Sequence, residues 1–131
     1  MKNQYFQKDK KAEVFFRESG YQTATGIWQQ GKDFYPISEF PLWCYARQNS
    51  QTVGFHAGII DVNEESRFFV FNYNPKVKQN MLIRYKGKWY KITRVDTQDD
   101  YNGDMFVYAD DAPTGEIPKD EHVKPYDPTK V

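Results

Sequence analysis

The feature that most constrains this chain is an alternating, aromatic-rich pattern in its second half. Four short runs carry it: RFFVFNY (67–73), MLIRY (81–85), KWYKITRV (88–95) and DMFVYA (104–109). Aromatic and β-branched side chains of this kind favour strands. Gly87 supplies the positive φ that a two-residue hairpin turn needs, and Asn102-Gly103 marks a second turn. These runs are therefore predicted to form an antiparallel meander, with Tyr90 and Ile92 on one face of its hairpin.

The first half of the chain predicts further strands from weaker patterns. They cover residues 12–17, 21–30 and 42–48, whereas FYPISEFP (34–41) is broken by prolines and indicates a sheet edge or a connector. Aromatic residues make up 18% of the chain, and leucine, a good helix former, is scarce, which leaves room for one short helix. The predicted fold is mainly β: a small β-barrel of about six or seven strands, with a sandwich as the alternative.

Three segments are distinct from the strands of this barrel domain, which is predicted to span residues 12–109. Residues 1–11 are polar and lysine-rich, and indicate a flexible N-terminal arm. Residues 49–66 contain two glycines and a small apolar centre, and are expected to form a long central loop of the kind that is often functional. Residues 110–131 are rich in proline and are expected to form an extended tail unless a partner covers them.

Composition and charge exclude several classes of protein. The 131 residues fit one domain, and 18 basic against 18 acidic side chains argue against general binding to polyanions. The mean hydropathy is −0.86 and no apolar run approaches the roughly 20 residues of a spanning helix, so no membrane contact is expected. The polar start predicts no secretory signal, and the single Cys44 cannot form an internal disulfide, which suits a reducing cytoplasm.

Candidate groups for catalysis are few. His56, in the central loop, is interpreted as a solvent-facing residue rather than a proton donor, and His122 lies in the tail. Cys44 alternates onto an apolar strand face, so a buried and unreactive thiol is expected. The sequence has no phosphate-loop, dinucleotide or nucleophile-elbow motif, and its acidic residues near 96–104 lack EF-hand spacing. We therefore expect no catalytic residue, no cofactor and no metal site, and hence a protein that is not an enzyme.

One segment leaves nucleic-acid binding open as an alternative. RYKGKWYK (84–91) interleaves basic and aromatic side chains, the mixture that stacking platforms for single-stranded nucleic acids use. A half-exposed hairpin with a lysine-rich turn shows the same alternation, and lysines on edge strands also prevent unwanted pairing. The zero net charge favours this second interpretation.

The segment from Phe68 to Ala109 resembles a known family. It contains MLIRYKGKWYKI, which has the form M-x-I-x-Y-x-G-x-x-Y-x-I, between the strand FFVFNY and a final strand after an acidic turn. This arrangement is similar to the head–tail connector family of long-tailed siphophages, specifically the head-closure or stopper proteins. The order of the earlier strands extends the resemblance to residues 12–109. It implies a small β-barrel with a long loop between its early and late strands, and a structural role.

The resemblance also implies where the function would lie. Copies of such proteins form a ring below the portal and adaptor, and the long loop projects into the central channel and retains the packaged DNA. On this chain the loop is 49–66, and the implied gating residues are Gly54, Phe55, His56, Gly58, Ile59, Ile60 and Asp61. The glycines would permit two arrangements of the loop, and its acidic exit would repel DNA phosphates.

Assembly partners follow from the same resemblance. They are further copies in a six- or twelve-fold ring, the adaptor and portal assembly, the tail-terminator or tail-tube proteins, and double-stranded DNA passing through the channel. Phe6, Trp89 and Tyr126 are the interface candidates, because aromatic side chains favour interface cores. The implied location is the neck of a virion assembled in the bacterial host cytoplasm. Another neck or tail-completion protein is the nearest alternative, and a single-stranded nucleic-acid-binding barrel is the alternative of a different class.

Overall fold

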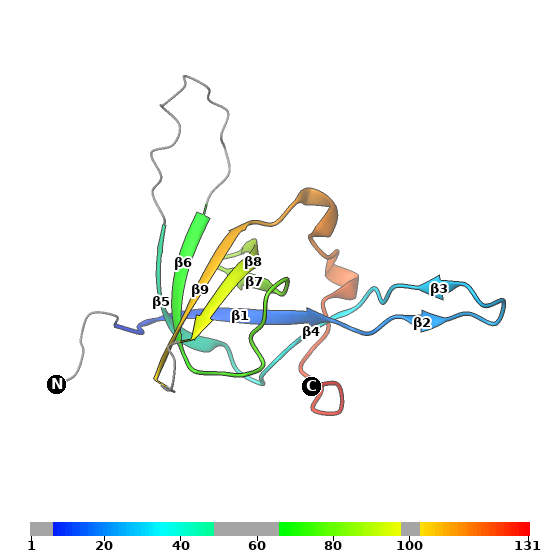
Figure 1. Cartoon of the computed structure of the whole chain (residues 1–131), viewed down its shortest axis with the longest axis horizontal. Helices are drawn as coiled ribbons and strands as arrows, with labels where there is room; N and C mark the ends of the chain where they lie inside the picture. The colour runs from blue at the N-terminus through cyan, green and yellow to red at the C-terminus, as the bar shows by residue number, and fades with distance from the viewer. Residues whose placement is uncertain (1–6, 49–65, 98–102) are drawn as a thin grey trace, which may run out of the picture.

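The computed structural model describes residues 7–48, 66–97 and 103–131 (Figure 1). The strands are β1 Lys10–Arg17, β2 Tyr21–Gln22, β3 Trp28–Gln29, β4 Phe34–Pro36, β5 Leu42–Gln48, β6 Ser66–Asn72, β7 Leu82–Tyr85, β8 Lys88–Thr97 and β9 Asp104–Asp111. Two 3-10 turns follow them, η2 Thr114–Glu116 and η3 Asp120–His122, and no α-helix occurs in the described ranges. The protein is mainly β, as the aromatic-rich composition predicts.

Six of the strands close into an antiparallel barrel. The sheet order is β4-β1-β5-β6-β9-β8-β7, and β7 pairs back onto β1, so that β1, β5, β6, β9, β8 and β7 form the closed ring and β4 adds to it on β1. Because β7 and β1 pair with each other, backbone N–H and C=O groups that would lie unpaired at the edges of an open sheet form hydrogen bonds. The predicted small barrel is therefore confirmed, and FYPISEFP contributes the extra strand β4 at its edge.

The interior of the barrel is filled by alternate side chains of its strands. Its fully buried members include Val14, Phe69, Phe71, Ile83, Tyr90, Ile92, Met105 and Val107. Phe69 lies edge-on to Tyr85 and Tyr90, with ring centroids 5.4 and 6.1 Å apart. Edge-to-face contacts of this kind add to the stabilisation from area burial. Part of the aromatic surplus of the sequence is thus used in the core.

The meander has the predicted register. Lys86 and Gly87 form the turn between β7 and β8 with φ of 53° and 79°, the pair of positive values that the tight hairpin turn requires. A bulge lies further along β8, between Ile92 and Arg94, and it shifts the register against β9. Tyr90 and Ile92 both point into the core, as their alternation predicts.

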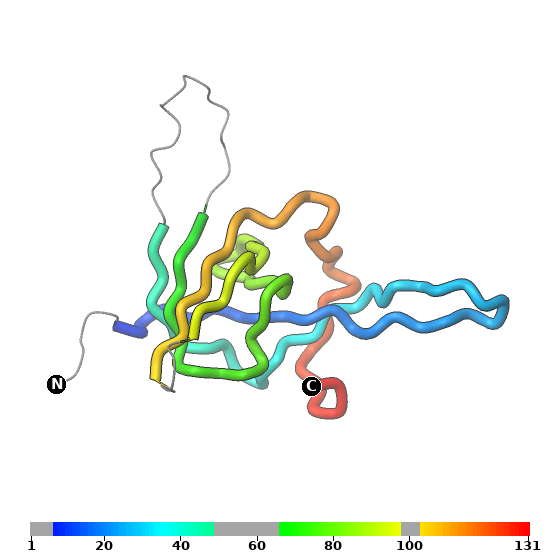
Figure 2. Tube along the Cα trace, in the orientation of Figure 1, coloured from blue at the N-terminus to red at the C-terminus, as the bar shows by residue number. Residues whose placement is uncertain are grey.

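The expectation of a single strand over residues 21–30 is wrong. The chain reverses within this segment, so that β2 and β3 pair with each other and form a hairpin that projects from the end of β1 (Figures 1 and 2). Gly26 adopts a φ of 88° at the reversal. A three-residue loop that ends in a left-handed glycine is a common hairpin connection, and it overrides the apparent alternation of the sequence.

The tail also differs from expectation, because part of it packs on the barrel. The backbone N–H of Lys124 donates to the carbonyl of Phe34 (2.9 Å), and Val123 forms a parallel bridge with Phe34. Ala112 is buried beside Phe15 and Phe34, and Val123 packs against the same cluster. A few apolar contacts at the edge of β4 therefore order a segment whose composition alone indicated an extended chain.

Candidate assembly surfaces

The gating residues expected from the sequence, Gly54, Phe55, His56, Gly58, Ile59, Ile60 and Asp61, lie outside the described residues, as does Phe6. The structure does describe both ends of their segment. β5 ends at Gln48 and β6 begins at Ser66, and Gln48 pairs with Arg67 across these neighbouring strands. The connection therefore leaves and re-enters the barrel at one rim, on two strands that are hydrogen-bonded to each other.

Trp89 packs against other parts of its own chain, on the outer side of the barrel wall. Its ring lies 5.1 Å from that of Phe15, and the guanidinium of Arg84 lies 5.3 Å from the Trp89 ring centroid. The side chain is half-buried, and the carbonyl of Trp89 accepts the backbone N–H of Ala112 (3.1 Å). This interface candidate thus connects β8 to β1 and to the start of the tail.

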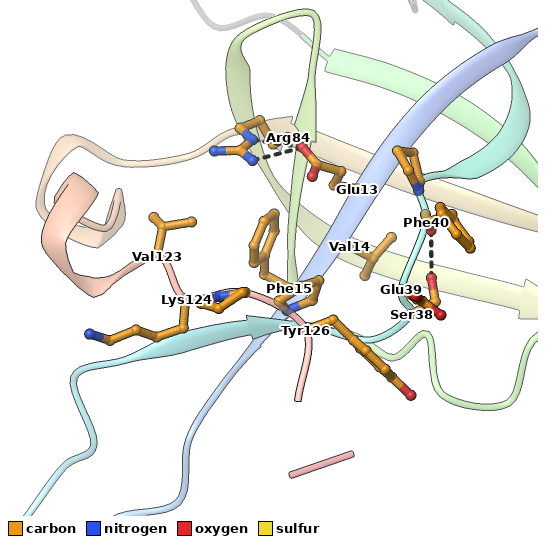
Figure 3. A pocket seen from close by; sticks show the side chains of 13 residues that line it. Glu13, Val14, Phe15, Ser38, Glu39, Phe40, Arg84, Val123, Lys124 and Tyr126 are labelled. Carbon is orange, nitrogen blue, oxygen red and sulfur yellow. Dashed lines mark hydrogen bonds and ion pairs between the residues drawn. The ribbon is translucent and has the colours of Figure 1, made fainter. Parts of the chain in front are cut away.

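Tyr126 lines a groove beside β1, which we call the proline–aromatic groove (Figure 3). Its volume is about 480 Å³, and its apolar lining includes Phe15, Pro36, Phe40, Pro41, Pro125 and Tyr126. One wall is the connection from β4 to β5, and the other is the tail after η3. Phe40 is the most exposed large apolar side chain described, at 71%, and the Ser38 hydroxyl donates to the Phe40 carbonyl (2.7 Å).

The charges in this groove balance one another. Nε of Arg84 donates to Oε1 of Glu13 at 2.8 Å, and a terminal nitrogen of the same guanidinium lies 2.8 Å from that oxygen. The guanidinium also stacks over Phe15 at 5.1 Å. Glu39 and Lys124 are the remaining charged residues of the lining. The groove therefore has a mixed lining of apolar and polar side chains, with an ion pair at one end.

The projecting hairpin (residues 18–33) is a second candidate surface, and the sequence pattern did not reveal it. Three large apolar side chains lie exposed on it: Tyr21 at 57%, Ile27 at 59% and Trp28 at 66%. Gln22 is the register partner of Trp28, and Tyr21 that of Gln29. Because opposite residues share a face, Trp28 lies on one face of the ribbon, and alternation puts Tyr21 and Ile27 on the other.

Local hydrogen bonds hold the projecting hairpin in shape. The N–H of Gly26 donates to the Thr23 carbonyl (2.9 Å), and the N–H of Thr23 donates to the Ile27 carbonyl (2.8 Å). The Trp28 ring lies so close to Gly20 that a Cβ there would come within 2.5 Å of it. Gly20 is thus needed for the ring to lie where it does. The glycine at position 26, just before an apolar pair, was the signal from which this hairpin could have been predicted.

Within residues 7–48, 66–97 and 103–131, the titratable groups do not form a catalytic arrangement. Nδ1 of His122 lies 2.9 Å from Oδ1 of Asp33, which attaches η3 to the start of β4. Among the described residues, no group of three histidine, cysteine or acidic side chains could hold a metal ion. Burial raises the pKa of the Cys44 thiol from 9.0 to about 12. No helix in the described part of the chain is long and apolar enough to cross a membrane.

The basic residues of the β7–β8 hairpin are mostly paired with carboxylates. Arg84 contacts Glu13, Nζ of Lys88 lies 3.3 Å from Asp111, and Nζ of Lys91 lies 2.8 Å from Glu116. A platform that binds phosphates needs cations that are available to them. These ion pairs weaken the nucleic-acid alternative that RYKGKWYK left open.

No protein-family model matches the sequence, and no curated protein matches it either. The fold can be compared with a solved structure. It is a chain of a structure described as "Virion of native gene transfer agent (GTA) particle", with 14% sequence identity and a TM-score of 0.47. The match covers 83% of this chain and 96% of that chain. We draw no functional conclusion from a likeness of this size.

Proposed function

We propose that this protein is a structural component of a phage virion: a head-closure, or stopper, subunit of the neck. In this role copies would form a ring below the portal and adaptor, retain the packaged DNA and offer the attachment surface for the tail. The sequence resemblance over residues 12–109 suggests the role, and the protein would contribute no catalysis. The alternative within the same biology is a neighbouring neck or tail-completion protein.

The observation that best supports the proposal concerns the root of the connection between β5 and β6, which is the pair of strand ends where this connection begins and ends. Neighbouring antiparallel strands can be joined by two residues, yet residues 49–65 connect Gln48 to Ser66 here. Both root strands belong to a closed barrel, and Val70 and Phe71 of β6 are almost completely buried. A rigid base of this kind is what a segment would need to resist the pressure of packaged DNA.

The surface charge supports a structural role over nucleic-acid binding. Cations of the β7–β8 hairpin are paired with Glu13, Asp111 and Glu116, and the chain has zero net charge. A protein that lets DNA slide past should not bind phosphates strongly. The free protein should accordingly bind single-stranded oligonucleotides weakly even at low salt, where a nucleic-acid-binding barrel would bind tightly and with a steep salt dependence.

The test of the proposal is a variant in which residues 50–64 are replaced by a two-residue Asn-Gly turn. In particles of the phage that encodes this chain, the variant should still join the neck, but filled heads should lose DNA. The measurement is nuclease-accessible DNA per filled head. The matched control carries a Gly-Ser segment of the original length, which separates the length of the connection from its sequence.

Two results would contradict the proposal. Particles with the shortened connection that retain DNA as well as the wild type would exclude the retaining role. Particles that assemble, hold DNA and infect without the protein would exclude any place in the neck. The melting temperature of the shortened variant has to match the wild type first, because the test requires an intact barrel.

A further inference from the structure

We propose that a basic recess at the root of the projecting hairpin binds an acidic segment of a partner protein. The recess has a volume of about 440 Å³ and lies between the β1–β4 pair and the tail, and its Lys and Arg residues are Arg17, Lys32 and Lys119. Three features carry the proposal: the fixed position of Arg17, cations that have no carboxylate partner, and an adjoining surface with amide side chains. The inference concerns a partner and does not require that the chain is a neck protein.

Strand register positions Arg17 in the recess. Arg17 and Phe34 lie opposite each other in the antiparallel pair of β1 and β4, so their side chains share a face. The guanidinium lies over the Phe34 ring, 5.0 Å from its centroid, and the ring itself is buried. Stacking of this kind orients the planar N–H fork that matches a carboxylate. Among the described residues no group accepts a hydrogen bond from this guanidinium, so the fork is available to a partner.

The cations of the recess are not neutralised by carboxylates. None of the three forms an ion pair with another residue of the described ranges. Of the described residues that line the recess only Glu116 is acidic, and its carboxylate already lies 2.8 Å from Nζ of Lys91. Three like charges around one recess repel one another, and a negatively charged partner would relieve that repulsion. The charge of the recess therefore selects an anionic partner.

The tail forms a wall of the recess that is held in place at both ends. Residues 115–119 line the recess beside the root of the hairpin (Figure 1). The ion pair between Glu116 and Lys91 attaches this wall to β8, and further along the tail Nδ1 of His122 lies 2.9 Å from Oδ1 of Asp33. A recess whose walls are already fixed loses less conformational entropy when a partner binds.

A second hollow adjoins the basic recess and shares Arg17 and Gln30 with it. Its volume is about 570 Å³, and Gln79 and Asn80 also line it. Amide side chains both donate and accept hydrogen bonds, as a peptide backbone requires. A single carboxylate or phosphate ion would use only a small part of this combined surface. The surface therefore favours a segment of several residues over a small anion.

The recess suits protein better than nucleic acid. Platforms for single strands combine cations with aromatic faces on which bases stack. The aromatic ring of the recess, Phe34, is only 6% exposed and lies beneath the Arg17 guanidinium, so a base has no face to stack on. Ile117 on the tail wall is 38% exposed and can contact an apolar side chain of the partner. An acidic peptide segment that also carries apolar residues therefore fits the recess best.

The test is an NMR titration of the full-length protein with a synthetic peptide in which aspartate and glutamate alternate with leucine and serine. The backbone amides of Arg17, Lys32, Glu116 and Lys119 should shift, with a Kd of about 1 mM or below, the range of weak contacts. Higher salt should weaken the binding, because it screens exposed charges. The matched peptide carries asparagine and glutamine in place of the acids, and it should leave these amides unshifted.

Two variants test the residues of the recess. Lys32→Glu should weaken binding at least about ten-fold, because like charges would then face each other. Arg17→Lys keeps the charge but removes the planar fork, and should weaken binding about three-fold. The matched control, Lys76→Glu, makes the same change in net charge as Lys32→Glu at an exposed lysine that lines a different hollow, and should change binding less than about two-fold. All three variants should melt near the wild-type temperature, since none of these side chains forms an ion pair with a described residue.

Three results would overturn the inference. The first is a titration in which the acidic peptide leaves the amides of the recess unshifted, and the second is an equal loss of binding in Lys32→Glu and Lys76→Glu, which would show attraction by overall charge alone. The third is an oligothymidylate that shifts the same amides at a lower concentration than the peptide does, which would assign the recess to nucleic acid. These titrations use pure protein and DNA retention is measured in particles, so this inference and the proposed function can fail separately.

Discussion

Arg84 and Glu13 are register partners across the seam at which β7 pairs with β1 and closes the barrel, and Nε of Arg84 donates to Oε1 of Glu13 at 2.8 Å. The guanidinium also lies over Phe15 and Trp89, at 5.1 and 5.3 Å. One side chain thus combines an ion pair with two aromatic contacts at the closing seam.

Replacing Arg84 should cost more than replacing its partner. Both side chains are about one-third exposed, so the ion pair itself contributes little, and Glu13→Gln should lower the free energy of unfolding by about 0.5 kcal/mol. Arg84→Ala also removes the stacked apolar stem, and should lower it by about 1–2 kcal/mol. Urea unfolding of both variants measures the difference. Equal losses would show that the aromatic contacts contribute nothing.

The β7–β8 turn offers a test of backbone strain. Gly87 has a φ of 79°, so Gly87→Ala should lower the free energy of unfolding by about 1–2 kcal/mol. Lys86 has a φ of 53°, and Lys86→Asn should raise stability because asparagine tolerates this conformation. Gly115→Ala is the matched control, since nothing lies within 4 Å of its added Cβ and no positive φ is required. If thermal unfolding shows the same loss of stability for Gly87→Ala and Gly115→Ala, the positive φ at Gly87 does not require glycine.

Cys44 predicts a pH dependence of stability. Its thiol has a pKa of about 12 in the folded protein against 9.0 as the ordinary value, because burial disfavours the thiolate. The folded state therefore holds the proton more tightly, and this contribution is present below pH 9 and lost as the pH rises towards 12. The loss is at most about 1.4 kcal/mol per pH unit.

The measurement for Cys44 is the stability difference between the wild type and Cys44→Ala at pH 8 and pH 10.5. The difference should fall with pH, whereas other groups that titrate in this range affect both proteins alike. A thiol reagent should modify Cys44 only as fast as the barrel opens. Rapid modification of the folded protein would contradict the burial of this side chain.

The packed part of the tail should stabilise the barrel. Val123 contacts the cluster of Phe15, Phe34, Leu82 and Ala112, so Val123→Asp would place a charge against apolar groups and should lower the free energy of unfolding by about 1–3 kcal/mol. Val131→Asp, at the exposed end of the chain, is the control and should change it by less than about 0.5 kcal/mol. Chemical unfolding compares the two. Equal effects would show that the tail packing adds nothing.

Prediction of the fold from the sequence was most accurate for strands that have one buried face. Tyr90 and Ile92 alternate with half-buried or exposed neighbours, and the Lys86-Gly87 turn fixes the register of their hairpin, so pattern and turn chemistry agreed. The same logic placed Cys44 in the core. These residues pack against near neighbours in the meander or into the single interior of the barrel. The alternation of apolar and polar residues is enough to predict such packing.

Prediction was weaker where the decisive partner is distant or local geometry overrides alternation. Thr23, Thr25, Ile27 and Gln29 alternate as in one strand, but the left-handed Gly26 reverses the chain among them. Val123 is one apolar residue among polar ones, and it is ordered by Phe34, which is remote in sequence and whose carbonyl accepts the backbone N–H of Lys124. The groove between Phe40 and Tyr126 likewise needs two segments that only the fold brings together.

The position of β1 has a consequence for how the protein folds. This strand pairs with β5 on one side and with β7 on the other, so its partners include residues as far away as Leu82–Tyr85. Pairings between segments so remote in sequence carry a large loop-closure entropy and slow the search for the native state. During synthesis on the ribosome the edge of β1 that pairs with β7 must therefore stay without its partner until β7 emerges. The lysines at the start of β1, Lys10 and Lys11, help to keep a waiting strand from pairing with the wrong chain.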